Sequence, residues 1–424
     1  MNKKKIVVLG GGFAGLQLAK KLNNSLFEIT LIDKQNHHQF QPLFYQVATA
    51  RLEPANISFP FRKIFQRSKN IQIRMAEAKR IIPASNQIET SEGTYQYDYL
   101  VIATGCKTNF FGNEQIRKHA YAMKSTQEAI AIRNDVLLSF EKFISSSQEE
   151  KEALLNIVIV GAGPTGVELA GAFAEMKKNI LPRDYPHIDF AGLSITILEG
   201  SKNTLNSMSG ESQKKSREYL EKMGVKIKTE VFVTDYDGTT VTLKGGEKLK
   251  SKNVIWAAGV TGNIIEGLEA DSINKNRFIV DRYNRIKNHP NIFAIGDIAY
   301  MVTPKYPQAH PQLGNVAINQ GKNLAHNLLA FERSKSLKEY EYKDLGSMAT
   351  VGEYKAVVDL PWLKFQGVIA WFAWMFLHLM LLLSARNKLL TFMNWTWNFL
   401  TKDSSLRLIF KSDLRDKETP PPNQ

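Results

Sequence analysis

The sequence predicts an α/β fold with two Rossmann-like dinucleotide-binding domains, followed by a C-terminal module of amphipathic helices. Two glycine-rich loops of the pattern GxGxxG begin at Gly10 and Gly161, each between a short apolar run and a helical pattern. An acidic residue closes the apolar run that follows each loop. Apolar segments rich in aromatic residues occupy the C-terminal part of the chain.

The first loop, Gly10 to Gly15, directly follows the apolar run Ile6 to Leu9. Glycines at this spacing permit a tight turn, close approach of the backbone to a pyrophosphate and packing of the helix against the strand. The helix N-terminus attracts the negative charge of the phosphates. Asp33 closes the next run, residues 28–32, where a carboxylate accepts hydrogen bonds from a ribose. These residues predict one dinucleotide site.

The second loop, Gly161 to Gly166, follows the apolar run Ile157 to Val160. Its acidic residue, Glu199, closes the run 193–198 and comes later than the ~20 residues that are typical. The longer spacing between the loop and Glu199 comes from residues 177–192, which we interpret as an extended helix and loop. Two nucleotide sites in one chain predict that a hydride passes from one cofactor to another.

Two further turns rich in small residues predict how the nucleotide domains close. Ala103-Thr104-Gly105 follows one predicted strand, and residues 256–259, ending in Gly259, follow another. An apolar strand then ends in Gly296-Asp297, which places one carboxylate against the ribityl chain of a flavin. The order of these features predicts a discontinuous FAD domain (1–112 and 283–350), an inserted NAD domain (113–282) and a C-terminal module (351–424).

The composition bears on partners and compartment. Lys and Arg outnumber Asp and Glu by 55 to 41, giving a net charge of +14 over 424 residues. The basic residues are scattered and no nucleic-acid motif is present, so we expect an anionic membrane surface as partner and no nucleic acid. The basic start of the chain imitates a signal peptide but lacks its long apolar run and cleavage site, which predicts a cytoplasmic chain.

Cys106 is the single cysteine of the chain. One thiol cannot form an intrachain disulfide, so a dithiol relay is excluded and the flavin must deliver electrons directly to an external acceptor. We expect Cys106 to be a buried, inert thiol. The sequence predicts no metal site.

The C-terminal segment 367–383 is apolar except for His378, and it stops before Arg386. It is just shorter than the ~18 residues that suggest a spanning helix, so a spanning, an interfacial and a buried helix all remain open. In residues 389–400, Thr391, Asn394 and Asn398 form a polar stripe among apolar and aromatic residues. With Arg407 and Lys411 nearby, this pattern favours a helix in the membrane interface. We expect His378 to be a packed or interfacial histidine rather than a ligand, and residues 417–424 to be disordered.

Nearly the whole chain resembles the type II NADH:quinone oxidoreductases, which are single-subunit, non-pumping NADH dehydrogenases. The resemblance rests on both loops and on three segments, 38–49 (HQFQPLFYQVAT), 161–171 (GAGPTGVELAG) and 344–352 (DLGSMATVG). It implies noncovalent FAD, NADH as donor and a membrane quinone, menaquinone or ubiquinone, as acceptor. It implies FAD contacts at Gly10, Gly12, Phe13, Ala14, Gly15, Asp33, Lys34, Thr49, Ala103 and Asp297. It implies NAD contacts at Gly161, Gly163, Thr165, Gly166, Glu199 and Gly259.

Glu168 follows the second loop and is the candidate catalytic residue. The resemblance implies that it aids substrate positioning or proton movement near the nicotinamide and flavin. The alternative is an acid that only complements the helix dipole. Hydride transfer itself requires no protein acid, because the cofactors carry the chemistry.

One departure from the family concerns the quinone. The matching helix usually reads Ala-Gln-x-x-x-Gln, but here it reads Gly314-Asn315-Val316-Ala317-Ile318-Asn319, followed by Gln320. Asparagine keeps the amide but is one methylene shorter, so a hydrogen bond requires a closer quinone or a bridging water. The quinone-site candidates are therefore Asn315, Asn319 and Gln320.

The sequence thus predicts an enzyme that passes a hydride from NADH to FAD and two electrons to a membrane quinone, without proton pumping. We expect a peripheral, monotopic protein on the cytoplasmic face of the inner membrane, and the formation of a homodimer stays open. The alternatives are an NAD(P)H-dependent reductase of a soluble acceptor such as ferredoxin, and a redox-signalling protein that binds NAD(H) and flavin.

Overall fold

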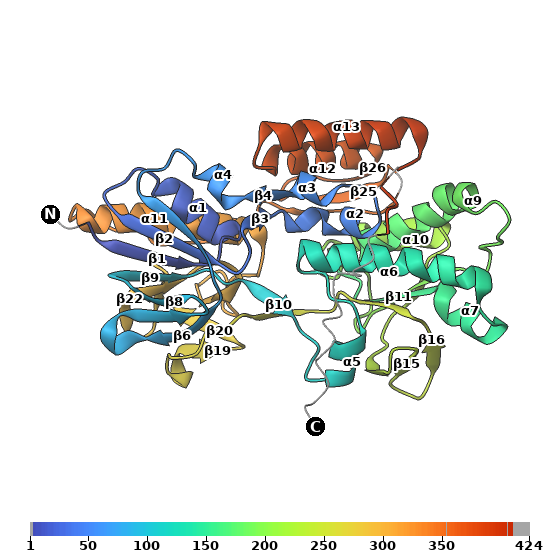
Figure 1. Cartoon of the computed structure of the whole chain (residues 1–424), viewed down its shortest axis with the longest axis horizontal. Helices are drawn as coiled ribbons and strands as arrows, with labels where there is room; N and C mark the ends of the chain where they lie inside the picture. Colours follow the sequence, from blue (N-terminus) through green and yellow to red (C-terminus); the bar gives the residue numbers. More distant parts are fainter. Residues whose placement is uncertain (1–2, 353, 405, 410–424) are drawn as a thin grey trace, which may run out of the picture. The chain divides into compact units, whose positions relative to one another are not determined.

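The computed structural model describes residues 3–352, 354–404 and 406–409, and these form two compact units (Figure 1). The first unit contains Met1–Phe40, Ser58–Asn109 and Gly259–Leu345. The second contains Gln41–Ile57, Phe110–Ala258 and Gly346–Gln424. The α/β class expected from the sequence is confirmed.

The first unit is built on a mixed sheet with the strand order β19-β20-β21-β22-β9-β1-β2-β5, and β23 pairs with β20. Its central strands run parallel and are buried, as expected for parallel strands covered on both faces. The strands are β1 (Lys5–Leu9), β2 (Glu28–Asp33), β5 (Ile71–Met75), β9 (Tyr99–Ile102), β19 (Ile273–Asn274), β20 (Arg277–Val280), β21 (Arg285–Ile286), β22 (His289–Ala294) and β23 (Ala299–Met301).

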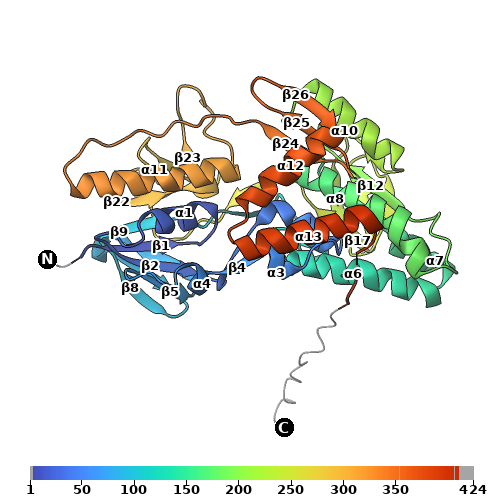
Figure 2. The same cartoon turned by 90° about the horizontal axis from the view of Figure 1, so that it is seen from above.

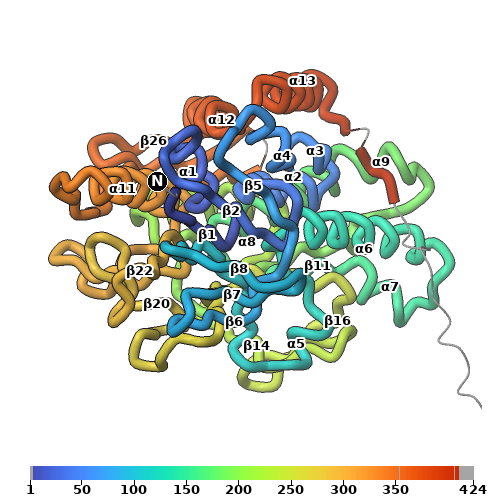
Figure 3. The backbone as a smooth tube through the Cα atoms, turned by 60° about the vertical axis from the view of Figure 1, so that its left-hand side comes forward, coloured from blue at the N-terminus to red at the C-terminus, as the bar shows by residue number. Residues whose placement is uncertain are grey.

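Smaller elements complete this unit. Strands β6, β7 and β8 pair as one antiparallel sheet and lie close together in Figure 3, and the main helices are α1 and α11. The bounds are β3 (His37–Gln39), β4 (Ser58–Pro60), β6 (Ala78–Ile82), β7 (Gln87–Thr90), β8 (Gly93–Gln96), β10 (Cys106–Thr108), β18 (Val260–Gly262), α1 (Phe13–Lys21), α4 (Phe61–Ile64) and α11 (Gly314–Glu332), with 3-10 turns η2 (Pro83–Ser85), η4 (Ala270–Ser272) and η5 (Gly296–Ile298).

The chain returns to the first sheet after the second glycine loop. Strand β22 lies parallel beside β9, with Ile292 opposite Leu100. Helix α11 then packs along α1 (Figure 2), where a Cβ on Gly321 would lie 2.4 Å from the Ala14 carbonyl oxygen. Glycine at this position therefore allows the two helices to approach closely.

The unit boundaries differ from those expected from the sequence. Residues 259–282 were expected in the NAD domain, but β18 pairs with β10, while β19 and β20 belong to the first sheet. Residues 41–57 were expected in the FAD domain, but they pack with α6, α8 and α13 of the second unit. Both differences arise from long-range strand pairing and helix packing, which local sequence patterns do not specify.

The second unit contains a parallel sheet of order β13-β12-β11-β17 and two antiparallel three-stranded sheets, β14-β15-β16 and β24-β25-β26. The strands are β11 (Asn156–Val160), β12 (Ser194–Leu198), β13 (Lys226–Lys228), β14 (Val233–Tyr236), β15 (Thr240–Leu243), β16 (Lys248–Lys250), β17 (Asn253–Trp256), β24 (Ser347–Thr350), β25 (Ala356–Asp359) and β26 (Lys364–Gly367).

The helices of the second unit include α12 and α13 near the C-terminus, which Figure 2 shows side by side. The helices of this unit are η1 (Gln41–Leu43), α2 (Phe44–Ala48), α3 (Pro54–Ile57), α5 (Glu114–His119), α6 (Thr126–Ser145), α7 (Gln148–Leu155), α8 (Pro164–Glu175), α9 (Leu181–Asp184), α10 (Gly210–Lys222), α12 (Val368–Leu381) and α13 (Ala385–Thr401). A π-helical turn, η3 (Met176–Ile180), joins α8 to α9. The structure thus confirms the extended helix and loop predicted for residues 177–192.

The C-terminal helices turn their apolar side chains outward. Polar Asn387 and Thr391 of α13 are buried instead, and Asn387 donates its amide hydrogens to the carbonyl oxygens of Ala55 and Asn56. The exposed large apolar residues are Val368, Ile369, Phe372, Phe376, Leu377, Met380 and Leu381 on α12 and Leu389, Phe392, Met393, Trp397, Phe399 and Leu400 on α13. Among the described residues, no helix combines the length and apolar character required to cross a bilayer.

Candidate active site

The first glycine loop has the shape that a pyrophosphate requires. Gly10 has φ +102°, and a Cβ there would lie 2.4 Å from the Ala103 carbonyl oxygen. A Cβ on Gly15 would lie 1.9 Å from the Gly10 carbonyl oxygen, whereas one on Gly12 would meet no atom within 4 Å. Gly10 and Gly15 thus close the turn against the sheet and helix. Gly12, between them, leaves open space at the N-terminus of α1.

Asp33 holds this loop from the end of β2. Its carboxylate accepts the Gly11 N–H at 2.6 Å and the Gln35 N–H at 2.7 Å. Burial raises the pKa of Asp33, and the two N–H donors oppose that rise. The next residue, Lys34, is exposed.

Aromatic residues border the same loop. The Phe13 ring meets the edge of His38, with ring centroids 5.3 Å apart. His38 is buried, with its Nδ1 3.0 Å from the Gly11 carbonyl oxygen, and burial lowers its pKa to about 4. The ring is therefore neutral at pH 7, and its Nδ1 carries the hydrogen that it donates to Gly11.

Asp297 lies in η5, directly after the turn at Gly296. Its carboxylate accepts the Cys106 thiol at 3.0 Å, and its carbonyl oxygen accepts the Gln312 amide at 3.0 Å. Cys106 is half-buried. The expectation that this thiol is buried was therefore wrong, because β10 turns the side chain toward the Asp297 carboxylate, whereas its inertness stays a prediction.

The quinone-site candidates lie on α11, where the structure gives them two different environments. Asn319 donates its amide to the Asn315 side-chain oxygen at 2.7 Å. Gln320 is 1% exposed and accepts the Gly296 N–H at 2.7 Å. Gln320 thus supports the turn that carries Asp297, and the structure does not bring it together with Asn315 and Asn319 on one open surface.

The second glycine loop repeats the geometry of the first. A Cβ on Gly161, at φ +106°, would lie 2.8 Å from the Ala257 carbonyl oxygen, and one on Gly166 would lie 1.9 Å from the Gly161 carbonyl oxygen. Gly163 again faces open space. The Glu199 carboxylate accepts the Ala162 N–H at 2.6 Å and the Ser201 N–H at 2.7 Å.

The remaining nucleotide candidates occupy varied positions. Thr165 is exposed at the start of α8. Gly259, at φ +77°, accepts the Asn109 N–H through its carbonyl oxygen and belongs to the first unit, unlike the other NAD candidates. Thr49, predicted to contact FAD, belongs to the second unit and donates its hydroxyl to the Tyr45 carbonyl oxygen.

Glu168 lies inside α8 and lines a pocket in the second unit. Its side chain is buried, and burial raises its pKa from 4.5 to about 8, against the opposing effects of the Thr350 N–H and the Trp374 side chain. The Thr350 N–H lies 3.4 Å from the carboxyl group. An acid that only complemented the helix dipole would favour its charged form. The environment of Glu168 favours the neutral form instead, and its role stays a prediction.

The pocket walls come from widely separated segments. Gly171 brings α8 against the end of β24, because a Cβ there would lie 2.5 Å from the Gly352 nitrogen. One turn further, Glu175 is buried and pairs with Arg51. The lining residues are Tyr45, Gln46, Arg51, Glu168, Ala172, Glu175, Thr350, Gly352, Tyr354, Trp371, Trp374, Met375, Trp395, Asn398 and Phe399.

Sequence reasoning assigned no role to most of these lining residues. Tyr45, Gln46 and Thr350 lie in segments that carry the family resemblance, which was the available signal. Trp374 and Trp395 were noted only as aromatic residues of apolar helices. His378 was predicted to be packed, and this is confirmed: it stacks on Trp374 with centroids 4.0 Å apart, and burial lowers its pKa to about 4.

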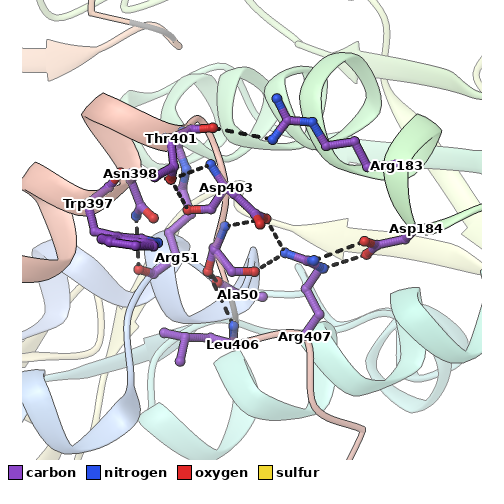
Figure 4. A network of polar contacts seen from close by, with 11 residues as sticks. Ala50, Arg51, Arg183, Asp184, Trp397, Asn398, Thr401, Asp403, Leu406 and Arg407 are labelled. Atoms are coloured by element: carbon purple, nitrogen blue, oxygen red, sulfur yellow. Dashed lines mark hydrogen bonds and ion pairs between the residues drawn. The ribbon is translucent and has the colours of Figure 1, made fainter.

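Arg407, which was expected beside a helix of the membrane interface, pairs with carboxylates of the protein itself. Its guanidinium binds Asp184 at 2.5 Å and Asp403 at 2.7 Å, as Figure 4 shows. Arg183 nearby donates to the Thr401 carbonyl oxygen at 3.2 Å. These contacts attach the chain after α13 to α9, so the charge of Arg407 is neutralised within the protein. Lys411 and the tail 417–424 lie outside the described residues.

Comparisons with known proteins agree with this geometry. The family model described as pyridine nucleotide-disulphide oxidoreductase matches residues 4–321, and the NDH2 C-terminal domain matches residues 345–402. Type II NADH:quinone oxidoreductase Ndh of Mycobacterium tuberculosis is 33% identical over 420 residues, covering 94% of this chain and 89% of the relative. The type II NADH:quinone oxidoreductase of Staphylococcus aureus is 28% identical over 363 residues, covering 84% and 89%.

Solved structures share the fold. NDH2 from Plasmodium falciparum in complex with NADH superposes with a TM-score of 0.88 at 23% identity, covering 97% of this chain and 100% of that one. The sulfide:quinone oxidoreductase from Aquifex aeolicus superposes with a TM-score of 0.72 at 21% identity, covering 95% and 98%. The chain therefore belongs to the type II NADH:quinone oxidoreductases, within the pyridine nucleotide-disulphide oxidoreductase family.

Proposed function

We propose that this protein oxidises NADH through bound FAD and reduces a membrane quinone, according to NADH + H⁺ + Q → NAD⁺ + QH₂. The observation that carries the proposal is the pocket of the second unit. It places a buried acid, Glu168, among side chains of α12 and α13, whose outer faces are apolar. Bound FAD supplies the chemistry that links a two-electron hydride donor to the quinone.

The two glycine loops fit the two cofactors. We assign the first loop, with Asp33, to FAD and the second, with Glu199, to NADH. Each carboxylate already accepts N–H groups of its own loop, which orients it beside the helix N-terminus where a ribose would lie. The negative charge of Glu199 would repel the 2′-phosphate of NADPH, so we expect a preference for NADH.

Glu168 is suited to supply a proton to the reduced quinone. With a pKa of about 8, roughly nine in ten Glu168 side chains are protonated at pH 7. A general acid works best when its pKa lies near the operating pH. We therefore assign Glu168 to proton delivery in the quinone pocket.

The outer faces of α12 and α13 support a peripheral position on the membrane. Exposed aromatic and aliphatic residues at helical spacing bind the interface between headgroups and acyl chains. Arg386 is exposed beside them and would attract anionic phospholipid. NADH is a cytoplasmic metabolite in this proposal, so the protein would lie on the cytoplasmic face.

The kinetic test replaces Glu168 with glutamine. We expect the reduction of FAD by NADH to be unchanged in Glu168→Gln, while reoxidation by menaquinone-1 slows about 100-fold because the proton donor is lost. Anaerobic stopped-flow absorbance of the flavin measures both steps. Glu221→Gln, an exposed acid on α10, is the control. Equal reoxidation rates in the variant and the native protein would contradict the role of Glu168.

The membrane test adds a charge to the apolar face. Phe376→Glu should weaken binding to phosphatidylglycerol liposomes about tenfold or more, because burial of a phenylalanine contributes roughly 1.5–3 kcal/mol. Ile144→Glu changes another exposed apolar residue, on α6 outside the face, and should bind like the native protein. Binding that is equal in both variants would favour the alternative, a reductase of a soluble acceptor.

A further inference from the structure

A chain of buried hydrogen bonds leads from α13 into the Glu168 pocket. The Trp395 indole N–H donates to Gln46 Oε1 at 2.7 Å, and Gln46 Nε2 donates to the Tyr45 hydroxyl at 2.9 Å. The Tyr45 hydroxyl lies 2.9 Å from Thr350 Oγ1. Thr350 and Glu168 both line this pocket, so the chain of hydrogen bonds ends at the pocket wall.

The direction of the first two bonds in this chain follows from its first member. An indole N–H can only donate, so it selects the oxygen of the Gln46 amide and turns the NH₂ group toward Tyr45. The Tyr45 oxygen then accepts from Gln46, and in the last bond either hydroxyl can donate to the other. With Tyr45 as the donor, the hydroxyl hydrogen of Thr350 points away from Tyr45.

All four side chains are buried, with Trp395 only 7% exposed. Water therefore competes little for these bonds, and a break at any link would leave a buried polar group without its partner. The directions of these hydrogen bonds depend on the position of α13, because Trp395 on this helix is the donor that begins the series. On the same helix, Trp397 is 60% exposed and takes no part.

We propose that the Thr350 hydroxyl donates a hydrogen bond to a carbonyl oxygen of the bound quinone, and that Trp395, Gln46 and Tyr45 are positioning residues that orient this donor. The inference rests on the proposed function, because it assumes that a quinone occupies the pocket. Thr350 would hold the carbonyl oxygen while Glu168 supplies the proton. The position of α13, whose outer face is apolar, would thereby control the orientation of a hydrogen-bond donor inside the pocket.

The first experiment removes the donor without changing its shape. Thr350→Val should weaken binding of menaquinone-1 to the oxidised enzyme about three- to tenfold, the effect of one hydrogen bond. Isothermal titration calorimetry measures this affinity without turnover. Thr350→Ser should restore it. Native affinity in Thr350→Val, or no recovery in Thr350→Ser, would overturn the proposal.

The second experiment tests the orienting chain from its far end. Trp395→Phe and Tyr45→Phe should each raise the KM for menaquinone-1 about two- to threefold, with a smaller change in kcat. Trp397→Phe is the matched control and should behave as the native protein. Liposome binding of Trp395→Phe should also equal that of the native protein, which shows that α13 stays seated.

A double-mutant cycle distinguishes coupling from local damage. If Trp395 acts through Thr350, adding Trp395→Phe to Thr350→Val should cause no further loss of quinone affinity. Additive losses would overturn the orienting role. The proposed function fails in a different way, because the native protein would then not bind menaquinone-1 at all.

Discussion

Helices α1 and α8 follow the two glycine loops, begin alike and then differ in what they contact. In both loops a Cβ added to the first glycine would clash with the backbone of the turn after a neighbouring strand. A Cβ on the third glycine would clash with the first glycine, and one on the middle glycine would face open space. Beyond the loop, α1 packs against α11 through Gly321, whereas α8 packs against β24 through Gly171. The same glycine-loop geometry thus occurs at both proposed nucleotide sites, and the later turns of each helix pack against different elements.

A position-by-position comparison shows the residues responsible. Glu168 and Gly171 of α8 correspond to Gln17 and Lys20 of α1, counted from the glycines. Gln17 is half-buried and Lys20 is exposed, while Glu168 is buried. A lysine in place of Gly171 would block the close approach of β24. The comparison teaches that the pocket depends on two positions at which the helices differ beyond the shared glycines.

The largest expected effect comes from the third glycine of each loop. Gly15→Ala places a Cβ 1.9 Å from Gly10 O, and we expect the purified protein to lose its FAD. Gly166→Ala makes the equivalent clash in the second loop, and we expect it to keep FAD but to lose reduction by NADH more than 100-fold. Flavin absorbance and its anaerobic bleaching by NADH measure the two outcomes.

Gly210→Ala is the control for these variants, because a Cβ there meets no atom within 4 Å. Loss of FAD from both Gly15→Ala and Gly166→Ala would break the comparison, since the two loops would then not serve separate cofactors.

A second effect concerns stability against pH. The folded pKa of Glu168, about 8, exceeds the unfolded value of about 4.5, so the folded state keeps a proton that the unfolded state has lost. Stability of the native protein therefore falls as the pH rises from about 4.5 to 8. Glu168→Gln removes this loss. The free energy of unfolding of the variant, relative to that of the native protein, should therefore be roughly 3 to 5 kcal/mol higher at pH 8 than at pH 4.5.

Urea unfolding of both proteins at pH 5 and pH 8 measures this gain. The mirror variant, Gln17→Glu, places an acid at the corresponding half-buried position of α1 and should show a much smaller dependence on pH. An equal dependence in both variants would show that burial on α8 is not the cause.

The smallest expected effect concerns the ribose carboxylates. Glu199→Gln keeps the shape but removes the charge, so we expect the KM for NADH to rise about tenfold and the preference over NADPH to shrink. Asp33→Asn should leave this preference unchanged, because it belongs to the FAD loop. Steady-state kinetics with both nucleotides measure the difference. An altered nucleotide preference in Asp33→Asn would contradict the assignment of the loops.

Truncation after about Lys355 is a poor test of the membrane module. In the structure, α12 and α13 bury Trp374 and Trp395 in the second unit, and Asn387 binds α3. Removing these helices would expose the pocket walls, so the point variant Phe376→Glu is preferable.

The sequence by itself determined the glycine loops, their acidic partners and the neighbouring strands. A positive φ at Gly10 and Gly161 and the alternation of buried strand with helix are local properties, written in adjacent residues. The family resemblance followed from these segments, and it is confirmed.

Only the tertiary structure decided which side chains share an environment. The joining of β19 and β20 to the first sheet and the pairing of Arg407 with Asp184 depend on residues distant in the chain. The raised pKa of Glu168 likewise requires β24 and α12 to exclude water from α8. Burial and partners are set by packing rather than by neighbours in sequence, which is why the motif located Glu168 but could not reveal its protonation state.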